Sequence, residues 1–301
     1  MRTFRSLVLA AGLVAVAGTL LVLAAGTGSA ADPFTAGQPS TRSLPLDATG
    51  QARAVARLRA LGPGLGLPAA ARHAAARLED RVEHATYDEV TGFDAADRAV
   101  SVARFELDGR LRTAVRLGWR LGERVGPDVA PAAVPALAER LARSAGLVPI
   151  GRPVVTRQQS TGWLVTWPRT VSGVPVVADG LRVTLWSDGS FHSLARSERP
   201  LAASPATVID EARVRALAAA KLDAWFPAPD RGGLTVEQPS LAWVAPNDTF
   251  EPALPDAPAA TLRLAWVASV RATGPAAGRV EAVELWFDAG DGRLLGGDVL
   301  R

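Results

Sequence analysis

Apolar and polar positions alternate through the middle of the chain, as they do in an antiparallel sheet with one buried face. The clearest apolar series comprises Leu181, Val183 and Leu185. Asp188 and Gly189 follow this series, and such a pair favours a tight hairpin because both central residues of the turn adopt positive φ. The pattern predicts a strand, a turn and a return strand that begins at Phe191.

An earlier alternating series consists of Trp163, Val165 and Trp167. It ends at Pro168, which cannot donate a backbone hydrogen bond to a central ladder. Together the two series predict three adjacent antiparallel strands within residues 162–194.

The same order recurs downstream. A helix is expected within residues 204–226, and strands are expected at 241–245, 262–271 and 280–288. The last of these strands leads into a turn at Asp291-Gly292. A fainter copy of the hairpin, RFELDGRL, occupies residues 104–111. The chain is therefore expected to contain two repeated units, and whether its first third forms another stays open.

The residues around the first hairpin form the pattern W-x-R-x-x-x-G-x-P-V, followed by an acidic residue and the Asp-Gly turn. The matching residues are Trp167, Arg169, Gly173, Pro175, Val176, Asp179, Asp188 and Gly189. This pattern resembles the PepSY and FTP group of domains, which occur in propeptides of thermolysin-like metallopeptidases and in free-standing secreted or membrane-anchored proteins. The resemblance implies an α+β fold of tandem small units, each a helix packed on an antiparallel sheet, and structural roles for the motif residues.

These patterns divide the chain into five expected segments. Residues 1–31 would form a signal peptide or N-terminal anchor, and 32–49 a linker rich in Pro, Ser, Thr and Gly. A helical and strand region would cover 50–128. The first PepSY-like unit would span 129–200 and the second 201–301.

The N-terminus has the features of a secretory signal. Arg2 and Arg5 precede an apolar run over residues 7–25, and the small residues that follow fit cleavage after Ala30 or Ala31. An uncleaved anchor is the alternative, because the run approaches the ~20 residues that a spanning helix needs. Either reading places the rest of the protein outside the cytoplasm, secreted or anchored. The sequence has no cysteine, which excludes disulfide bonds.

The stretch 51–78 contains five arginines and no acidic residue. Two helices are expected here, at 51–61 and 68–84, separated by the breaker GPGLGLP. Such a basic pair suits an alternative function, contact with anionic lipid or a wall polymer. The residues expected to make that contact are Arg53, Arg57 and Arg59. The net charge of +3 gives no reason to expect a nucleic-acid partner.

The sequence lacks the motifs of a reaction centre. The H-E-x-x-H motif of the related peptidases is absent, and the histidines, His73, His84 and His192, do not cluster as zinc ligands do. We therefore expect no metal ion, no cofactor and no enzymatic activity. A less favoured enzyme alternative would use a pair of carboxylates near turns and strand ends. The candidates for that pair are Asp179, Asp188, Asp288 and Asp291.

The candidate binding surface is a groove or sheet edge lined by aromatic residues. It comprises Trp163, Trp167, Arg169 and Trp186. Two interpretations stay open: the rings fill the core, or they help to capture an extended peptide by strand addition. The resemblance implies a non-enzymatic module that contacts an extracytoplasmic protein, restraining a secreted peptidase or modulating a sensor protein.

Overall fold

A computed structural model describes residues 41–80, 85–117, 126–158, 162–226, 231–247, 249–250, 261–274, 277 and 282–300. The expected signal peptide or anchor and His84 lie outside these ranges. No helix within them is long and apolar enough to span a membrane. The chain forms two compact units, which we call the N-terminal unit (Pro39–Pro200) and the C-terminal unit (Leu201–Ala257 with Thr261–Arg301).

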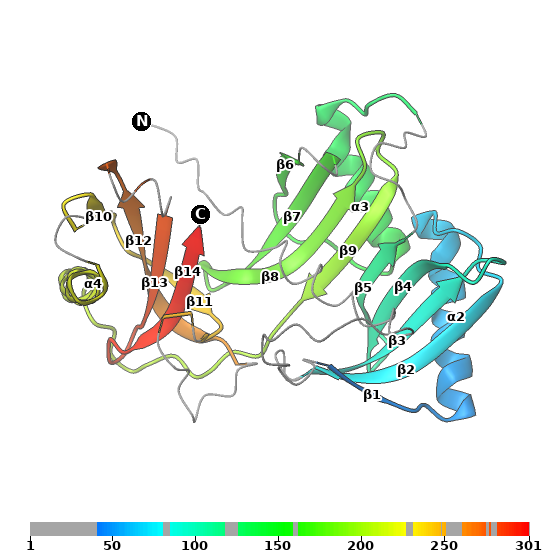
Figure 1. Cartoon of the computed structure of the whole chain (residues 1–301), viewed down its shortest axis with the longest axis horizontal. Coiled ribbons are helices and arrows are strands. Elements are labelled where there is room, and N and C mark those ends of the chain that lie inside the picture. The colour runs from blue at the N-terminus through cyan, green and yellow to red at the C-terminus, as the bar shows by residue number, and fades with distance from the viewer. Residues whose placement is uncertain are drawn as a thin grey trace, which may run out of the picture. The chain divides into compact units, whose positions relative to one another are not determined.

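The N-terminal unit is one antiparallel sheet with two helices on one face (Figure 1). Its strands run in the spatial order β1-β2-β3-β4-β5-β9-β8-β7-β6. The elements are β1 (Thr41–Leu44), α2 (Ala48–Leu65), β2 (Arg72–Asp80), β3 (Ala85–Phe93), β4 (Ala99–Glu106), β5 (Leu111–Arg116), a 3-10 turn (Pro131–Ala133), α3 (Val134–Ser144), β6 (Val154–Gln158), β7 (Gly162–Val171), β8 (Val174–Leu185) and β9 (Phe191–Ser197).

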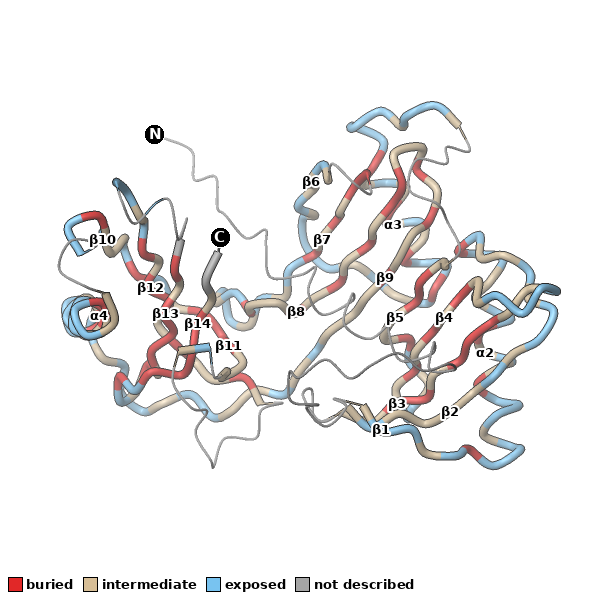
Figure 2. The backbone as a smooth tube through the Cα atoms, in the orientation of Figure 1, coloured by how far each residue is buried: buried red, intermediate tan, exposed pale blue. Residues whose placement is uncertain are grey.

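A single core joins the two helices of this unit to the sheet. It includes Leu58 from α2, Ala138 from α3 and the alternating residues of β8 that the sequence predicts to be buried. Figure 2 shows buried positions along the middle of β8 and β9, whereas no residue of β6 is buried.

The C-terminal unit repeats this layering on a smaller scale. Strand β12 is central: β10 and β11 pair with it on one side, and β13 followed by β14 on the other. Helix α4 packs on this sheet through Val214, Ala218 and Leu222. The elements are α4 (Glu211–Trp225), β10 (Leu234–Val236), β11 (Ser240–Val244), β12 (Arg263–Ala272), β13 (Ala282–Asp288) and β14 (Leu294–Leu300). The fold is α+β, as the sequence predicts.

The buried helix positions reveal three structural repeats. Ala54, Val134 and Val214 are fully buried in α2, α3 and α4, and they follow one another at intervals of 80 residues. Leu58, Ala138 and Ala218 are buried one helical turn later and have the same spacing. We call the segments α2–β5, α3–β9 and α4–β14 the first, second and third repeats.

The closing hairpins of the repeats share one turn design. Gly109, Gly189 and Gly292 all have positive φ, at 93°, 82° and 78°. In each turn the preceding aspartate accepts a hydrogen bond from the backbone N–H two residues later, at 2.8–2.9 Å. A register shift also lies just before each turn, in β4, β8 and β13. The faint copy at 104–111 is thus the closing hairpin of a repeat.

The structure corrects the expected helices near the N-terminus. Helix α2 continues through the predicted breaker to Leu65 and ends at Gly66, whose left-handed φ of 65° allows its N–H to bond back into the last turn. The second expected helix, 68–84, is wrong over its described part. Residues 72–80 instead form β2, because pairing with β1 and β3 overrides the helix propensity of an alanine-rich segment.

Two expected boundaries also change. The segment 32–49 is not simply a linker, because it contains β1 and the first residues of α2. Across the expected boundary between residues 128 and 129 the sheet is continuous, since β5 of the first repeat pairs with β9 of the second. The chain instead passes from the N-terminal unit to the C-terminal unit between Pro200 and Leu201.

Candidate functional site

The tryptophans of the predicted groove are core residues. Trp163 and Trp167 expose 8% and 4% of their surface and pack in the core beneath the two helices. Arg157 lies over the ring of Trp163, with its guanidinium carbon 4.6 Å from the ring centroid. Trp186 is also 8% exposed and meets His192 edge to face at 4.6 Å. The core interpretation holds for these rings, and the structure contradicts an exposed tryptophan-lined groove.

The arginine and the acidic residue of the motif meet in a buried ion cluster. Asp179 has a fully buried side chain, and it lies 3.1 Å from Arg169 Nη1 and 2.7 Å from Arg199 Nε. It also accepts hydrogen bonds from the Ser197 hydroxyl at 2.8 Å and from the Arg199 backbone N–H at 2.8 Å. The two arginines in turn donate to the carbonyls of Arg199 and Val177. The cluster therefore ties β7 and β8 to the end of β9.

The electrostatics of this cluster favour the charged carboxylate. Burial by itself raises the pKa of Asp179, but the charge of Arg199 and the hydrogen bonds from Arg199 and Ser197 outweigh it and hold the pKa below its usual value. Asp179 consequently stays ionised and serves as a structural counter-charge. This agrees with the structural role that the resemblance implies.

The other motif residues also build the scaffold. Gly173 follows Ser172 in the tight turn between β7 and β8, and both have positive φ, at 81° and 51°. Pro175 is exposed early in β8, while Val176 is buried. Asp188 accepts hydrogen bonds from the N–H and the hydroxyl of Ser190 in the closing turn. None of these contacts points to a reaction.

The carboxylate candidates do not converge on one site. Asp288 and Asp291 accept backbone hydrogen bonds in the closing turn of the third repeat. A carboxylate pair that sequence reasoning missed lies nearby: Glu284 of β13 stands directly opposite Asp298 of β14. Burial and the charge of Asp298 raise the pKa of Glu284, against a smaller lowering by a hydrogen bond with Trp286. Only the strand register, which the sequence does not display, brings these two acids together.

Strand β6 presents an open edge. Among the described residues it pairs only with β7, in an unbroken register from Val154↔Thr166 to Gln158↔Gly162. It has neither a bulge nor an internal proline, two of the devices that protect edge strands from pairing with another chain. The opposite edge of the sheet, β1, is shorter, with four residues.

The approach to this edge is apolar and exposed. Val148 and Ile150 expose 68% and 82% of their surface, and Val154 at the start of β6 exposes 48%. Arg152 is exposed between them, and Arg157 pairs with Asp128 at 3.5 Å. Val148 and Ile150 precede β6 in the chain, and exposed apolar residues of this kind are a feature of interaction surfaces. We call residues 148–158 the β6 edge; sequence reasoning missed it, although the run LVPIGRPVV carries the signal.

The basic residues of the alternative function are divided by the fold. Arg53 and Arg59 are exposed on α2 and form no ion pair with described residues. Arg57 is half-buried, with its guanidinium carbon 5.9 Å from the centroid of Phe105. Arg72 and Arg77 lie on a strand and pair with Asp97 and Asp88. The pair of basic helices does not exist, and the envelope contact stays an untested prediction.

Within the described ranges, no group of three or more His, Asp or Glu side chains could hold a metal ion.

Comparison with known proteins finds similarity in structure but not in sequence families. No protein-family model matches the chain, and no curated protein matches it. Among solved structures, the chain is similar to the Bacillus megaterium YpeB C-terminal domain, with 12% identity and a TM-score of 0.44. The similarity covers 86% of this chain and 99% of that one.

Proposed function

We propose that this protein is a non-enzymatic, extracytoplasmic binding module that holds an extended segment of a partner protein along the β6 edge. The observation that carries the proposal is the open, regular edge of β6, which begins at the exposed Val154 and follows the exposed Val148 and Ile150 in the chain. An added strand would bond to the outward N–H and C=O groups of β6, and its side chains would supply specificity.

The chemistry of the β6 edge defines the segment that fits. Apolar residues on the added strand would pack beside Val154 on one face and Val155, which borders the core, on the other. The edge contains no acidic residue, and because Arg157 already pairs with Asp128, Arg152 is its arginine without an ion pair to described residues. The expected ligand is therefore an extended apolar segment with an acidic side chain near one end. The sequence resemblance favours a secreted peptidase or a sensor protein as its source.

The test begins with a photo-reactive amino acid in place of Ile150, introduced into the full chain in its native host. Leu107 is the matched control position, because it is an apolar residue that is 55% exposed in the closing turn of the first repeat. Mass spectrometry then maps the segment that crosslinks at 150 but not at 107. A synthetic copy of this segment is titrated into purified protein.

The variants decide the outcome. The double variant I150S/V154K should weaken binding of the synthetic segment by at least about tenfold, whereas L107S should leave it unchanged. Equal binding by I150S/V154K and the unaltered protein would remove the β6 edge as the site. Cleavage or another reaction of the segment by the protein would overturn the non-enzymatic part of the proposal.

A further inference from the structure

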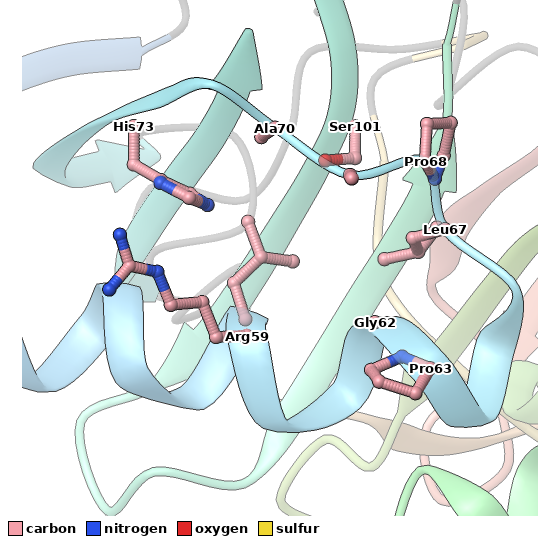
Figure 3. Close-up of a pocket in the computed structure, with 10 residues that line it drawn as sticks. Arg59, Gly62, Pro63, Leu67, Pro68, Ala70, His73 and Ser101 are labelled. Carbon is pink, nitrogen blue, oxygen red and sulfur yellow. The ribbon is translucent and has the colours of Figure 1, made fainter. Parts of the chain in front are cut away.

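The N-terminal unit contains a second feature, a cavity between α2 and the sheet that the proposed function does not use. Its volume is about 320 Å³, within the range of small-molecule sites. Much of the wall is apolar and comes from the end of α2 and the segment that leads into β2. In Figure 3, Pro63, Leu67 and Pro68 line one end, while Arg59 and His73 lie together at the other.

One buried polar atom without a partner in the described protein meets this space. His73 Nδ1 is buried and has no hydrogen-bond partner. Arg59 lies close enough to lower the pKa of His73, the smaller cause after burial. Ser101, which is 2% exposed, contributes to the wall from β4. A buried polar atom without a partner costs free energy, so His73 favours a ligand that bonds to its Nδ1.

The charge at the polar end is positive. Arg59 forms no ion pair with described residues, and α2 contains no acidic residue at all. Arg72, on the strand next to His73, is already paired with Asp97. A carboxylate is the group that would satisfy a guanidinium and an imidazole N–H at once.

We infer that this cavity binds a small organic carboxylate with a compact, branched apolar body. The carboxylate oxygens accept hydrogen bonds from Arg59 and His73, and the apolar body lies against Leu58, Leu67 and Pro68. Two sources share this chemistry: a free small acid and the C-terminal residue of a peptide chain. The site belongs to the first repeat, whereas the β6 edge belongs to the second. The inference is therefore independent of the proposed function.

The test uses three probes on the full chain: isovalerate, N-acetyl-leucine and N-acetyl-leucine amide. Binding is followed through the ring signals of His73 in NMR spectra. Isovalerate and N-acetyl-leucine should shift these signals at millimolar concentration, whereas the amide should not, because it lacks the charge. Tighter binding of N-acetyl-leucine than isovalerate would indicate a peptide terminus, and the reverse a free acid.

Two variants separate binding from folding. R59Q should weaken the binding of both acids by at least about tenfold, with the exposed R53Q on the same helix as its matched control. A69L should narrow the cavity with little loss of stability, because Ala69 lines it and is exposed. No shift at His73 with either acid, or equal binding by A69L or R59Q, would overturn the inference.

Discussion

The second and third repeats place a helix on an antiparallel meander in the same way, yet they bury different charges in the strand before the closing turn. In the second repeat, Asp179 is surrounded by Arg169 and Arg199 and its pKa is lowered. In the third, Glu284 faces another acid, Asp298, and its pKa is raised. The apolar positions that define the scaffold recur every 80 residues in the helices, whereas the charged positions do not.

This difference distinguishes the residues that form the shared fold from the residues that differ between the repeats. Buried helix residues and the Asp-Gly turn are common to all three repeats, so they follow from the need to cover one sheet face and reverse the chain. The ion cluster of Asp179, the Glu284 and Asp298 pair and the β6 edge each belong to one repeat. Functional differences between the repeats should therefore arise at these places.

The largest expected effect is the loss of the Asp179 carboxylate. D179N leaves Arg169 and Arg199 largely buried without their counter-charge, and breaking a buried ion pair in this way costs about 3–5 kcal/mol. The free energy of unfolding in urea measures it. The control is D291N in the exposed turn of the third repeat, which should cost less than about 1 kcal/mol. Equal losses would show that the cluster does not stabilise the second repeat.

The turn glycines test whether the repeats are equivalent. G189A and G292A should each cost about 1–2 kcal/mol, because alanine is disfavoured at the positive φ that both residues adopt. The added Cβ would also press on a leucine side chain in each case, Leu137 at 2.6 Å and Leu217 at 2.7 Å.

Urea unfolding of these two variants should therefore give similar losses. G232A, at a position with free space around it and no positive φ, is the matched control and should be close to neutral. A large loss for one turn and none for the other would break the correspondence between the repeats.

The opposite pKa shifts predict opposite pH dependence. The folded state holds a proton on Glu284 more tightly than the unfolded chain does, so its contribution to stability is present below pH 4.5 and is lost as the pH rises through the folded pKa. E284Q should therefore gain stability relative to the unaltered protein as the pH rises above that range. Asp179 behaves in the reverse sense: its contribution is present above pH 3.8 and is lost as the pH falls through the lower, folded pKa.

Urea unfolding measures both effects when it is repeated between pH 3 and pH 8, at pH values about one unit apart. D179N should differ most from the unaltered protein at neutral pH and least in acid. If the unfolding free energies of E284Q and the unaltered protein differed by the same amount at every pH, Glu284 would have the same pKa in the folded and unfolded states.

The smallest expected effect on stability is at the β6 edge. I150S should change the free energy of unfolding by no more than about 0.5 kcal/mol, because its side chain is 82% exposed and contributes little to the core. A loss comparable with that of D179N would show that this surface is part of the folded core and is not available to a partner.

The hairpins were predictable from the sequence because their signals are local. Alternation through Leu181 and the Asp188-Gly189 pair specify the second closing hairpin, and the structure confirms it. Strand β2 was not predictable, because its alanine-rich sequence favours a helix and only the neighbouring strands make it extended. The ion cluster also escaped prediction, since Arg199 lies twenty residues beyond Asp179 and meets it only through the pairing of β8 and β9.

The predicted site failed for a related reason. Tryptophans on alternating positions indicate strands, but alternation does not say which face is covered, and Trp163 and Trp167 proved to face the helices. The β6 edge depends on which strand has only one neighbour. That is a property of the sheet order and cannot be read from five residues alone.

Amide hydrogen exchange along β6, measured with and without the crosslinked partner segment, tests the central claim most directly. Strand addition predicts slower exchange for amides within residues 154–158 whose N–H groups point away from β7, because they become hydrogen-bonded in the complex. The closing turn of the first repeat should not change. Unaltered exchange along β6, with new protection elsewhere in the chain, would contradict the account.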